Sequence, residues 1–299
     1  MGVDHSADYR AGRPAGALRG LVDSYTGYRV VGPPGVHRGL PSRHVTFVVA
    51  VEEITVTGPA AGGALTATAM VGGMHDRPVL ITHSGVQTGV QLGVTPDGAR
   101  ALFGVPAGEL TGLVVPLDAV LPRAAELADR LATAGDWPAR FAALDDVLLA
   151  DVRGRSGRGA APSPEVGHAW RRLLAVSGAA SVTALAGEVG WSRRHLAERF
   201  RREIGLPPKV AARVLRFERA RAELLRPGPA GTAPRLADVA VACGYADQAH
   251  LTREWRGLAG CTPSTWLAEE APWLHGPSVE RTAADLPFVQ DGPRSLAAG

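Results

Sequence analysis

The sequence predicts an α+β protein, with an N-terminal small β barrel or sandwich, a helical pair, and a C-terminal all-α domain of tandem helix-turn-helix units. Short stretches rich in β-branched residues, with Gly and Pro between them, occupy residues 28–121. A helical periodicity follows over 122–151, and one helical unit then occurs twice between Ser181 and Leu267. These three patterns divide the chain into a β-rich part and a helical part.

The strands predicted in the β-rich part cover residues 44–51, 54–57, 65–71 and 86–94, and residues 18–25 are predicted to be a short helix or a lead-in. In the strand at 86–94, alternation places Val90 and Leu92 on one face and Gln87 and Gln91 on the other. Several short strands with turn signals between them are typical of a small sandwich or barrel.

Residues 122–151 are predicted to form two helices, with a break at Gly-Asp-Trp-Pro over 135–138. Leu127 and Leu131 mark the apolar stripe of the first helix, and Leu148 belongs to that of the second. Because these stripes lie outside the predicted sheet, we expect the helical pair to provide the contact of a homodimer.

The repeated unit has the pattern of a helix-turn-helix. A short amphipathic helix is followed by Gly and an aromatic residue, and a second helix then begins at a capping residue, Ser192 in one copy and Asp247 in the other. In the second helix of the first copy, Leu196 and Phe200 lie four residues apart and form an apolar stripe. Leu251 and Trp255 correspond to Leu196 and Phe200, and the other large aromatic residues of this region are predicted to lie in the core.

The two units and the helix predicted between them at 207–226 resemble the DNA-binding domain of the AraC family of bacterial transcription regulators. The resemblance covers about residues 165–270, and it is carried by the run from Gly244 to Gln248 and by the closing run from Gly260 to Pro263. A tandem pair with such a linker is far more specific than a lone helix-turn-helix pattern. The resemblance implies a non-enzymatic regulator that binds double-stranded DNA, with contact to RNA polymerase left open.

Outward-facing residues of the second helices are the candidates for DNA contact, because such a helix enters the major groove. They are Arg193, Arg194, Glu198, Arg201, Gln248, His250, Thr252, Arg253 and Arg256. Arginine can donate two hydrogen bonds to guanine, and glutamate can accept one from cytosine. The alternatives are phosphate contacts without base readout and, for Glu198, an ion pair with Arg194 one turn away.

The charge distribution favours the same partner. Residues 1–150 contain 11 basic and 14 acidic side chains, whereas residues 151–270 contain 19 basic and 12 acidic ones. Positive charge is therefore concentrated in the domain that carries the repeats, as expected for a phosphate-binding domain. With no long apolar run, no signal-peptide pattern and only two cysteines, we expect a cytoplasmic protein with no membrane partner.

These patterns predict five regions along the chain. They are a disordered tail at 1–17, a sensing or dimerisation domain at 18–152, a flexible linker at 153–163, an AraC-type DNA-binding domain at 164–270 and a disordered tail at 271–299. Within the sensing domain, the turn at 73–78 and the strand at 85–93 resemble an uncharacterised N-terminal domain of some regulators of this family. The arrangement implies control by a small-molecule effector or by dimerisation.

The candidates for polar groups in an effector pocket are His75, Arg77, Gln87 and Gln91. Four histidines of the β-rich part, at 37, 44, 75 and 83, match no strong metal-ligand spacing, so we expect neither a metal nor a cofactor. The alternative function is an enzyme, for DNA repair or another reaction, fused to a DNA-binding domain. An alkyl-transfer repair enzyme needs a nucleophilic thiolate, and no Cys precedes Cys243.

Overall fold

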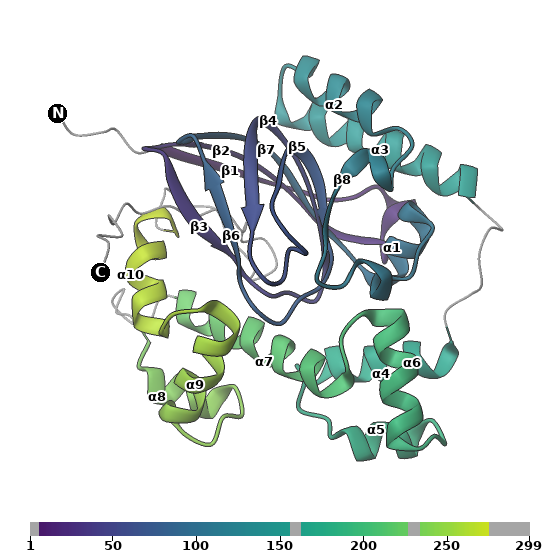
Figure 1. Ribbon diagram of the computed structural model, residues 1–299, viewed down its shortest axis with the longest axis vertical. Helices are drawn as coiled ribbons and strands as arrows, with labels where there is room; N and C mark the ends of the chain where they lie inside the picture. Colours follow the sequence, from purple (N-terminus) through teal and green to yellow (C-terminus); the bar gives the residue numbers. More distant parts are fainter. Residues whose placement is uncertain (1–5, 156–162, 227–233, 275–299) are drawn as a thin grey trace.

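The computed structural model describes residues 6–155, 163–226 and 234–274, with side chains up to residue 269. A curled antiparallel sheet forms one half of the molecule, and a second, all-helical half lies beneath it (Figure 1). Helices α1 to α3 pack at one end of the sheet, and α4 to α10 form the helical half (Figure 1). The predicted α+β architecture is confirmed.

The sheet contains eight strands in the order β1-β2-β7-β4-β5-β8, with β6 and β3 attached to the far part of β4. Their bounds are Ser6–Gly12 (β1), Val22–Val31 (β2), Gly35–Gly39 (β3), Val45–Thr57 (β4), Leu65–Gly72 (β5), Val79–His83 (β6), Val86–Val94 (β7) and Val114–Pro116 (β8). Among the described residues, the order ends at β1 and β8 without closing into a ring. The fold is therefore a curled sheet with an apolar interior.

The long strand β4 produces the curl. Its first half, Val45 to Ala50, pairs with β7, whereas Thr55 to Thr57 pair with β6. The register with β5 shifts between Val49 and Ile54, which bends the strand. The two strands predicted at 44–51 and 54–57 are thus one strand, in which Glu52 accepts a hydrogen bond from the backbone N–H of Thr88 at 2.7 Å.

The N-terminal segment differs from the prediction of a disordered tail at 1–17. Residues 6–12 form β1, which pairs along its whole length with β2, and Tyr9 is buried beside Tyr28. A strand can form through backbone hydrogen bonds to a neighbouring strand without being apolar. The polar sequence of residues 6–12 therefore gave no sign of this strand. The helix considered at 18–25 is also wrong, because only Gly16–Leu18 (η1) is a 3₁₀ turn and β2 follows.

Helices α1 to α3 pack on one face of the sheet, and together they form a hydrophobic core. Their bounds are Pro96–Phe103 (α1), Ala124–Thr133 (α2) and Trp137–Arg155 (α3), with 3₁₀ turns at Ala107–Leu110 (η2) and Leu117–Ala119 (η3). Leu127, Leu131 and Leu148 are buried in this core together with Phe47 and Leu92. The predicted dimer contact through these leucines is therefore wrong, because their apolar stripes already pack within the chain.

The helical half consists of α4 (Pro164–Ala175), α5 (Val182–Glu188), α6 (Arg193–Ile204), α7 (Pro208–Leu225), α8 (Leu236–Ala242), α9 (Gln248–Ala259) and α10 (Pro263–Leu274). Helix α3 includes residues 153–155, so the predicted linker is helical at its start, and its residues 156–162 lie outside the described residues. Helix α10 extends to Leu274, beyond the predicted domain end at 270, and the tail from 275 onward is also outside them. No helix in the described ranges has the length and apolarity to cross a bilayer.

Candidate nucleic-acid interface and effector cavities

The two helix-turn-helix units lie at the two ends of α7, on the side of the molecule away from the sheet (Figure 1). In each unit a glycine with a left-handed backbone forms the turn, Gly190 with φ 70° and Gly244 with φ 74°. The predicted caps are present, since the Ser192 side chain accepts from the N–H of His195 and the Asp247 side chain from that of His250. Local sequence thus starts both recognition helices, α6 and α9.

The apolar stripes hold the recognition helices in place. Leu196 and Phe200 of α6 are fully buried, as are Leu251 and Trp255 of α9. The Trp255 ring packs on Phe217 of α7, with ring centroids 4.7 Å apart. This packing leaves the opposite face of each helix free for a partner.

Most of the predicted DNA-contacting side chains lie on that opposite face. The exposed ones are Arg193, Arg194, Glu198, Arg201, Gln248, Arg253 and Arg256. Arginines that are exposed on such helices can donate to base edges or to phosphates. Neither Arg194 nor Arg253 is buried, so both units present a guanidinium group to solvent.

His250 and Thr252, the other two predicted contacts, are half-buried and have partners within the chain. His250 Nδ1 accepts from the N–H of Ala246 at 3.2 Å, and its ring lies 5.3 Å from that of Tyr245. The Thr252 hydroxyl donates to the carbonyl of Gln248 at 2.9 Å. This geometry favours a structural role for both side chains in the second unit.

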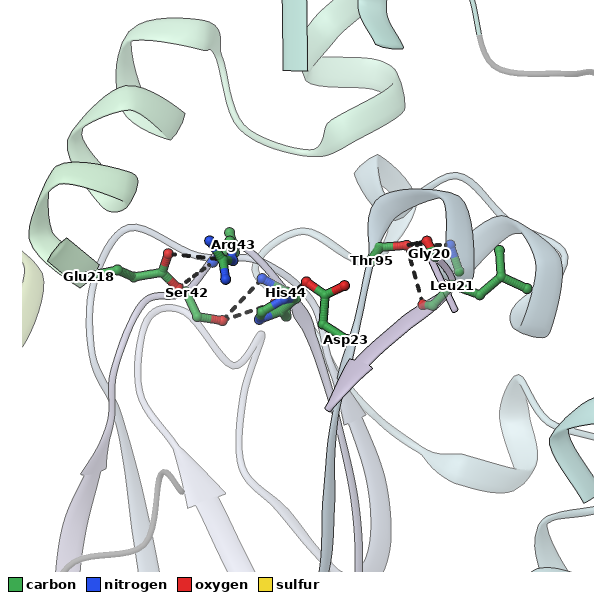
Figure 2. A network of polar contacts seen from close by, with 9 residues as sticks. Gly20, Leu21, Asp23, Ser42, Arg43, His44, Thr95 and Glu218 are labelled. Atoms are coloured by element: carbon green, nitrogen blue, oxygen red, sulfur yellow. Dashed lines mark hydrogen bonds and ion pairs between the residues drawn. The ribbon is translucent and has the colours of Figure 1, made fainter. Parts of the chain in front are cut away.

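Among the contacts that dock the helical half on the sheet half, three stand out. Arg38 of β3 pairs with Glu269 of α10. The backbone N–H of Arg43 donates to Glu218 of α7 at 3.0 Å (Figure 2). The turn η2 packs closely on the C-terminal end of α6. There, a methyl group on Gly108 would overlap the backbone carbonyl of Arg202.

A polar network surrounds the Arg43 contact (Figure 2). His44 Nε2 lies 2.7 Å from a carboxylate oxygen of Asp23, and this hydrogen bond lowers the pKa of Asp23. Next to Arg43, the Ser42 hydroxyl accepts a hydrogen bond from the His44 backbone N–H and lies within donating distance of the His44 carbonyl. These residues were not singled out from the sequence as a group, because they meet only when the sheet curls and α7 docks.

An apolar cavity of about 60 Å³ lies inside the curled sheet, and we call it the inner cavity. Its apolar walls are Val48, Ile54, Val56, Met70, Val79 and Ile81. Of the predicted pocket residues, His75, Gln87 and Gln91 line it, whereas Arg77 is exposed and does not. Gln87 and Gln91 thus lie on one face of β7, as predicted, and this face lines the inner cavity.

His37 also lines the inner cavity, and it is 4% exposed. Neither of its ring nitrogens has a hydrogen-bond partner among the described residues. Burial lowers the pKa of His37 to about 3, so the ring is neutral at physiological pH. The His83 ring lies 5.5 Å away, centroid to centroid.

A second cavity, of about 310 Å³, lies between the sheet and α7, and we call it the interdomain cavity. Ser42, Arg43 and His44 line it from the sheet, and Arg219 and Arg221 line it from α7. Thr46 and Gln91 line both the inner and the interdomain cavity, so the two adjoin at these residues. Sequence reasoning missed this site because its walls come from segments about 175 residues apart in the chain.

Two of the four described histidines of the sheet half, His37 and His75, line the inner cavity, and the His83 ring lies 5.5 Å from that of His37. His44 pairs with Asp23 outside the inner cavity, and no group of three His, Cys, Asp or Glu side chains suited to a metal occurs within the described ranges.

Comparison with known proteins identifies one domain in the helical half. Residues 185–269 match the family model described as a helix-turn-helix domain. No curated protein matches the chain in sequence. An AraC-type DNA-binding-domain protein from Chromobacterium violaceum is 26% identical, over 38% of this chain and 96% of that chain, with a TM-score of 0.32.

The whole chain is similar in fold to ToxT from Vibrio cholerae strain SCE256. The apo form has a TM-score of 0.53 at 8% identity and covers 90% of this chain and 99% of that chain. The form with bound unsaturated fatty acid has a TM-score of 0.51 at 8% identity, over 89% and 96% of the two chains. The helical half thus contains a helix-turn-helix domain that includes both α6 and α9, and the whole chain has a fold similar to that of ToxT.

Proposed function

We propose that the chain binds a specific DNA operator through α6 and α9 and that an amphipathic organic acid controls this binding. The observation that carries the proposal is the pair of adjoining cavities. One is apolar, and the other is lined by arginines from both halves of the molecule, which outnumber the two glutamates that also line it, Glu218 and Glu223. ToxT has been crystallised with unsaturated fatty acid bound, and its fold is similar at low identity. The two cavities of this chain support the proposed effector class independently of that similarity.

For DNA recognition, we propose Arg193 and Arg194 of α6 and Arg253 of α9 as base-edge contacts. Arg201 and Arg256, near the C-terminal ends of the same helices, are better placed for phosphates. Gln248 and Glu198 are the remaining exposed candidates for base contact.

The test begins with an operator obtained by sequencing fragments that the protein selects from random DNA. Arg194→Ala and Arg253→Ala should each weaken operator binding by about 1–3 kcal/mol and relax the preference at particular base pairs. Arg123→Ala, which changes an exposed arginine on the other half of the molecule, is the matched control. An equal loss on operator and random DNA would assign these arginines to phosphates instead.

For the effector, we propose that the carboxylate lies in the interdomain cavity near Arg43 and Arg219 and that the apolar chain enters the inner cavity past Thr46 and Gln91. The inner cavity has room for about four water molecules, which favours a short or medium chain. Because both halves of the molecule form the interdomain cavity, an acid bound there would bind the docked arrangement more tightly than an undocked one.

Octanoic acid should therefore change operator affinity by about fivefold or more, measured by fluorescence anisotropy with increasing acid. Arg219→Ala should weaken binding of the acid, since it removes a cation from the interdomain cavity, and Arg123→Ala should not. Binding of the acid with no change in operator affinity would contradict the regulatory part of the proposal. A homodimer remains a prediction, and sedimentation with and without operator would test it.

A further inference from the structure

We infer that the inner cavity recognises a second, uncharged hydrogen-bonding group on the effector through His37. A hydroxyl, carbonyl or amide far from the carboxylate would fit this description. The inference rests on the proposed function, since it concerns the same ligand. It specifies that the effector carries a hydrogen-bonding group on its chain as well as a carboxylate.

The first step is the unmet hydrogen-bonding capacity of His37. The side chain is 4% exposed and lines the inner cavity, and both ring nitrogens lack a partner in the described part of the chain. Buried polar groups in folded proteins are nearly always hydrogen-bonded, because an unpaired one costs about 1–3 kcal/mol. A group that enters the cavity, from water or from a ligand, would meet this need.

The second step is the absence of charge. No Arg, Lys, Asp or Glu lines the inner cavity within the described residues. A second carboxylate would therefore be buried without a counter-charge, which is strongly unfavourable. A neutral imidazole instead donates from one nitrogen and accepts at the other, so a hydroxyl can pair with either of the two.

The third step is the position of His37 along the sheet. His37 pairs with Ile81 of β6, and Ile81 pairs with Val56 near the end of β4. Thr46, where the two cavities adjoin, lies near the start of β4. The hydrogen-bonding group and the carboxylate would thus lie at opposite ends of the effector, with apolar walls between them.

The test compares octanoic acid with ω-hydroxyoctanoic acid, and dodecanoic acid with its ω-hydroxy form, by calorimetry on the full chain. The wild-type protein should bind one of the hydroxy acids about tenfold more tightly than the plain acid of equal length. His37→Leu should remove this preference and keep binding of the plain acid. His37→Gln, which retains a donor and an acceptor, should keep part of the preference.

A second readout is the nitrogen NMR signal of His37, which should shift with the hydroxy acid and much less with the plain acid. If plain and hydroxy acids bind equally well to the wild type, a bound water satisfies His37 and the inference is wrong while the proposed function stands. A preference that persists in His37→Leu would also overturn it. If no acid binds at all, the proposed effector fails, and this inference fails with it.

Discussion

Arg199 of α6 and Glu254 of α9 occupy equivalent positions in the two recognition helices, yet they carry opposite charges. Arg199 pairs with Glu203 of its own helix at 2.9 Å, and Glu203 in turn accepts from the backbone N–H of Ser163 at 2.8 Å. Glu254 instead reaches α7, where Arg213 lies 3.2 Å away. The first recognition helix is thus tied to the start of α4 and the second to the connecting helix.

The two units also meet the sheet half in different ways. The first unit packs its backbone against η2, where Gly108 leaves no room for a side chain next to Arg202. The second unit is joined through the ion pair between Arg38 and Glu269, both of which are partly exposed, and Gly260 lies next to the Pro78 side chain. Equivalent sequence units are therefore docked by tight backbone packing in one case and by an ion pair with a lighter side-chain contact in the other.

Removing Glu254 should have the largest effect. Glu254→Ala leaves Arg213 and Arg216 of α7 without their shared carboxylate, which is only 15% exposed. Loss of one partner of a buried ion pair costs about 3–5 kcal/mol, and less for a pair that water still reaches. We expect urea unfolding to show a loss of about 2–3 kcal/mol.

Glu198→Ala is the matched control, because Glu198 is an exposed carboxylate on the other recognition helix. It should leave the free energy of unfolding nearly unchanged. If both variants lose the same free energy of unfolding, the ion pairs of Glu254 with Arg213 and Arg216 do not make the second unit different from the first.

Gly108→Ala should disturb the docking of the first unit alone. The added methyl group would overlap the backbone carbonyl of Arg202, and a backbone cannot move aside as a flexible side chain can. Overpacking of this kind costs about 1–3 kcal/mol. Hydrogen exchange should become faster in η2 and at the end of α6, and it should not change in α9.

Gly135→Ala is the control, because nothing lies within 4 Å of the added methyl group. If hydrogen exchange in α6 stays the same in Gly108→Ala, η2 does not hold the first unit.

Arg38→Ala should have the smallest effect. Partly exposed ion pairs contribute about 0.2–1 kcal/mol, and salt screens them. We expect faster hydrogen exchange in α10 around Glu269 in the variant, and raised salt should produce the same change in the wild type. If raised salt speeds hydrogen exchange in η2 as much as in α10, the two units are not docked by different kinds of contact.

Several features of the chain followed from local sequence. Ser192 and Asp247 cap the recognition helices, and Gly190 and Gly244 form the turns, because each of these choices depends only on the nearest neighbours in the chain. The apolar stripes predicted the buried faces, since helical periodicity fixes which side chains share a face.

Local sequence was misleading where a segment depends on a distant partner. Strand β1 is polar and forms because β2 offers it a free edge, and the leucines of α2 and α3 pack within the chain because one face of the sheet covers them. Neither partner is close in sequence to the segment that it stabilises.

Local sequence was enough to predict the helix-turn-helix units, their caps and turns, and the exposed face of α6 and α9. The position and lining of the cavities depend instead on how distant segments pack. His37, Gln91 and Arg219 come from distant parts of the chain, and the curl of β4 and the docking of α7 place them around two adjoining cavities. Helical periodicity is a local property of the backbone, whereas a cavity is formed by surfaces that meet only after the chain has folded.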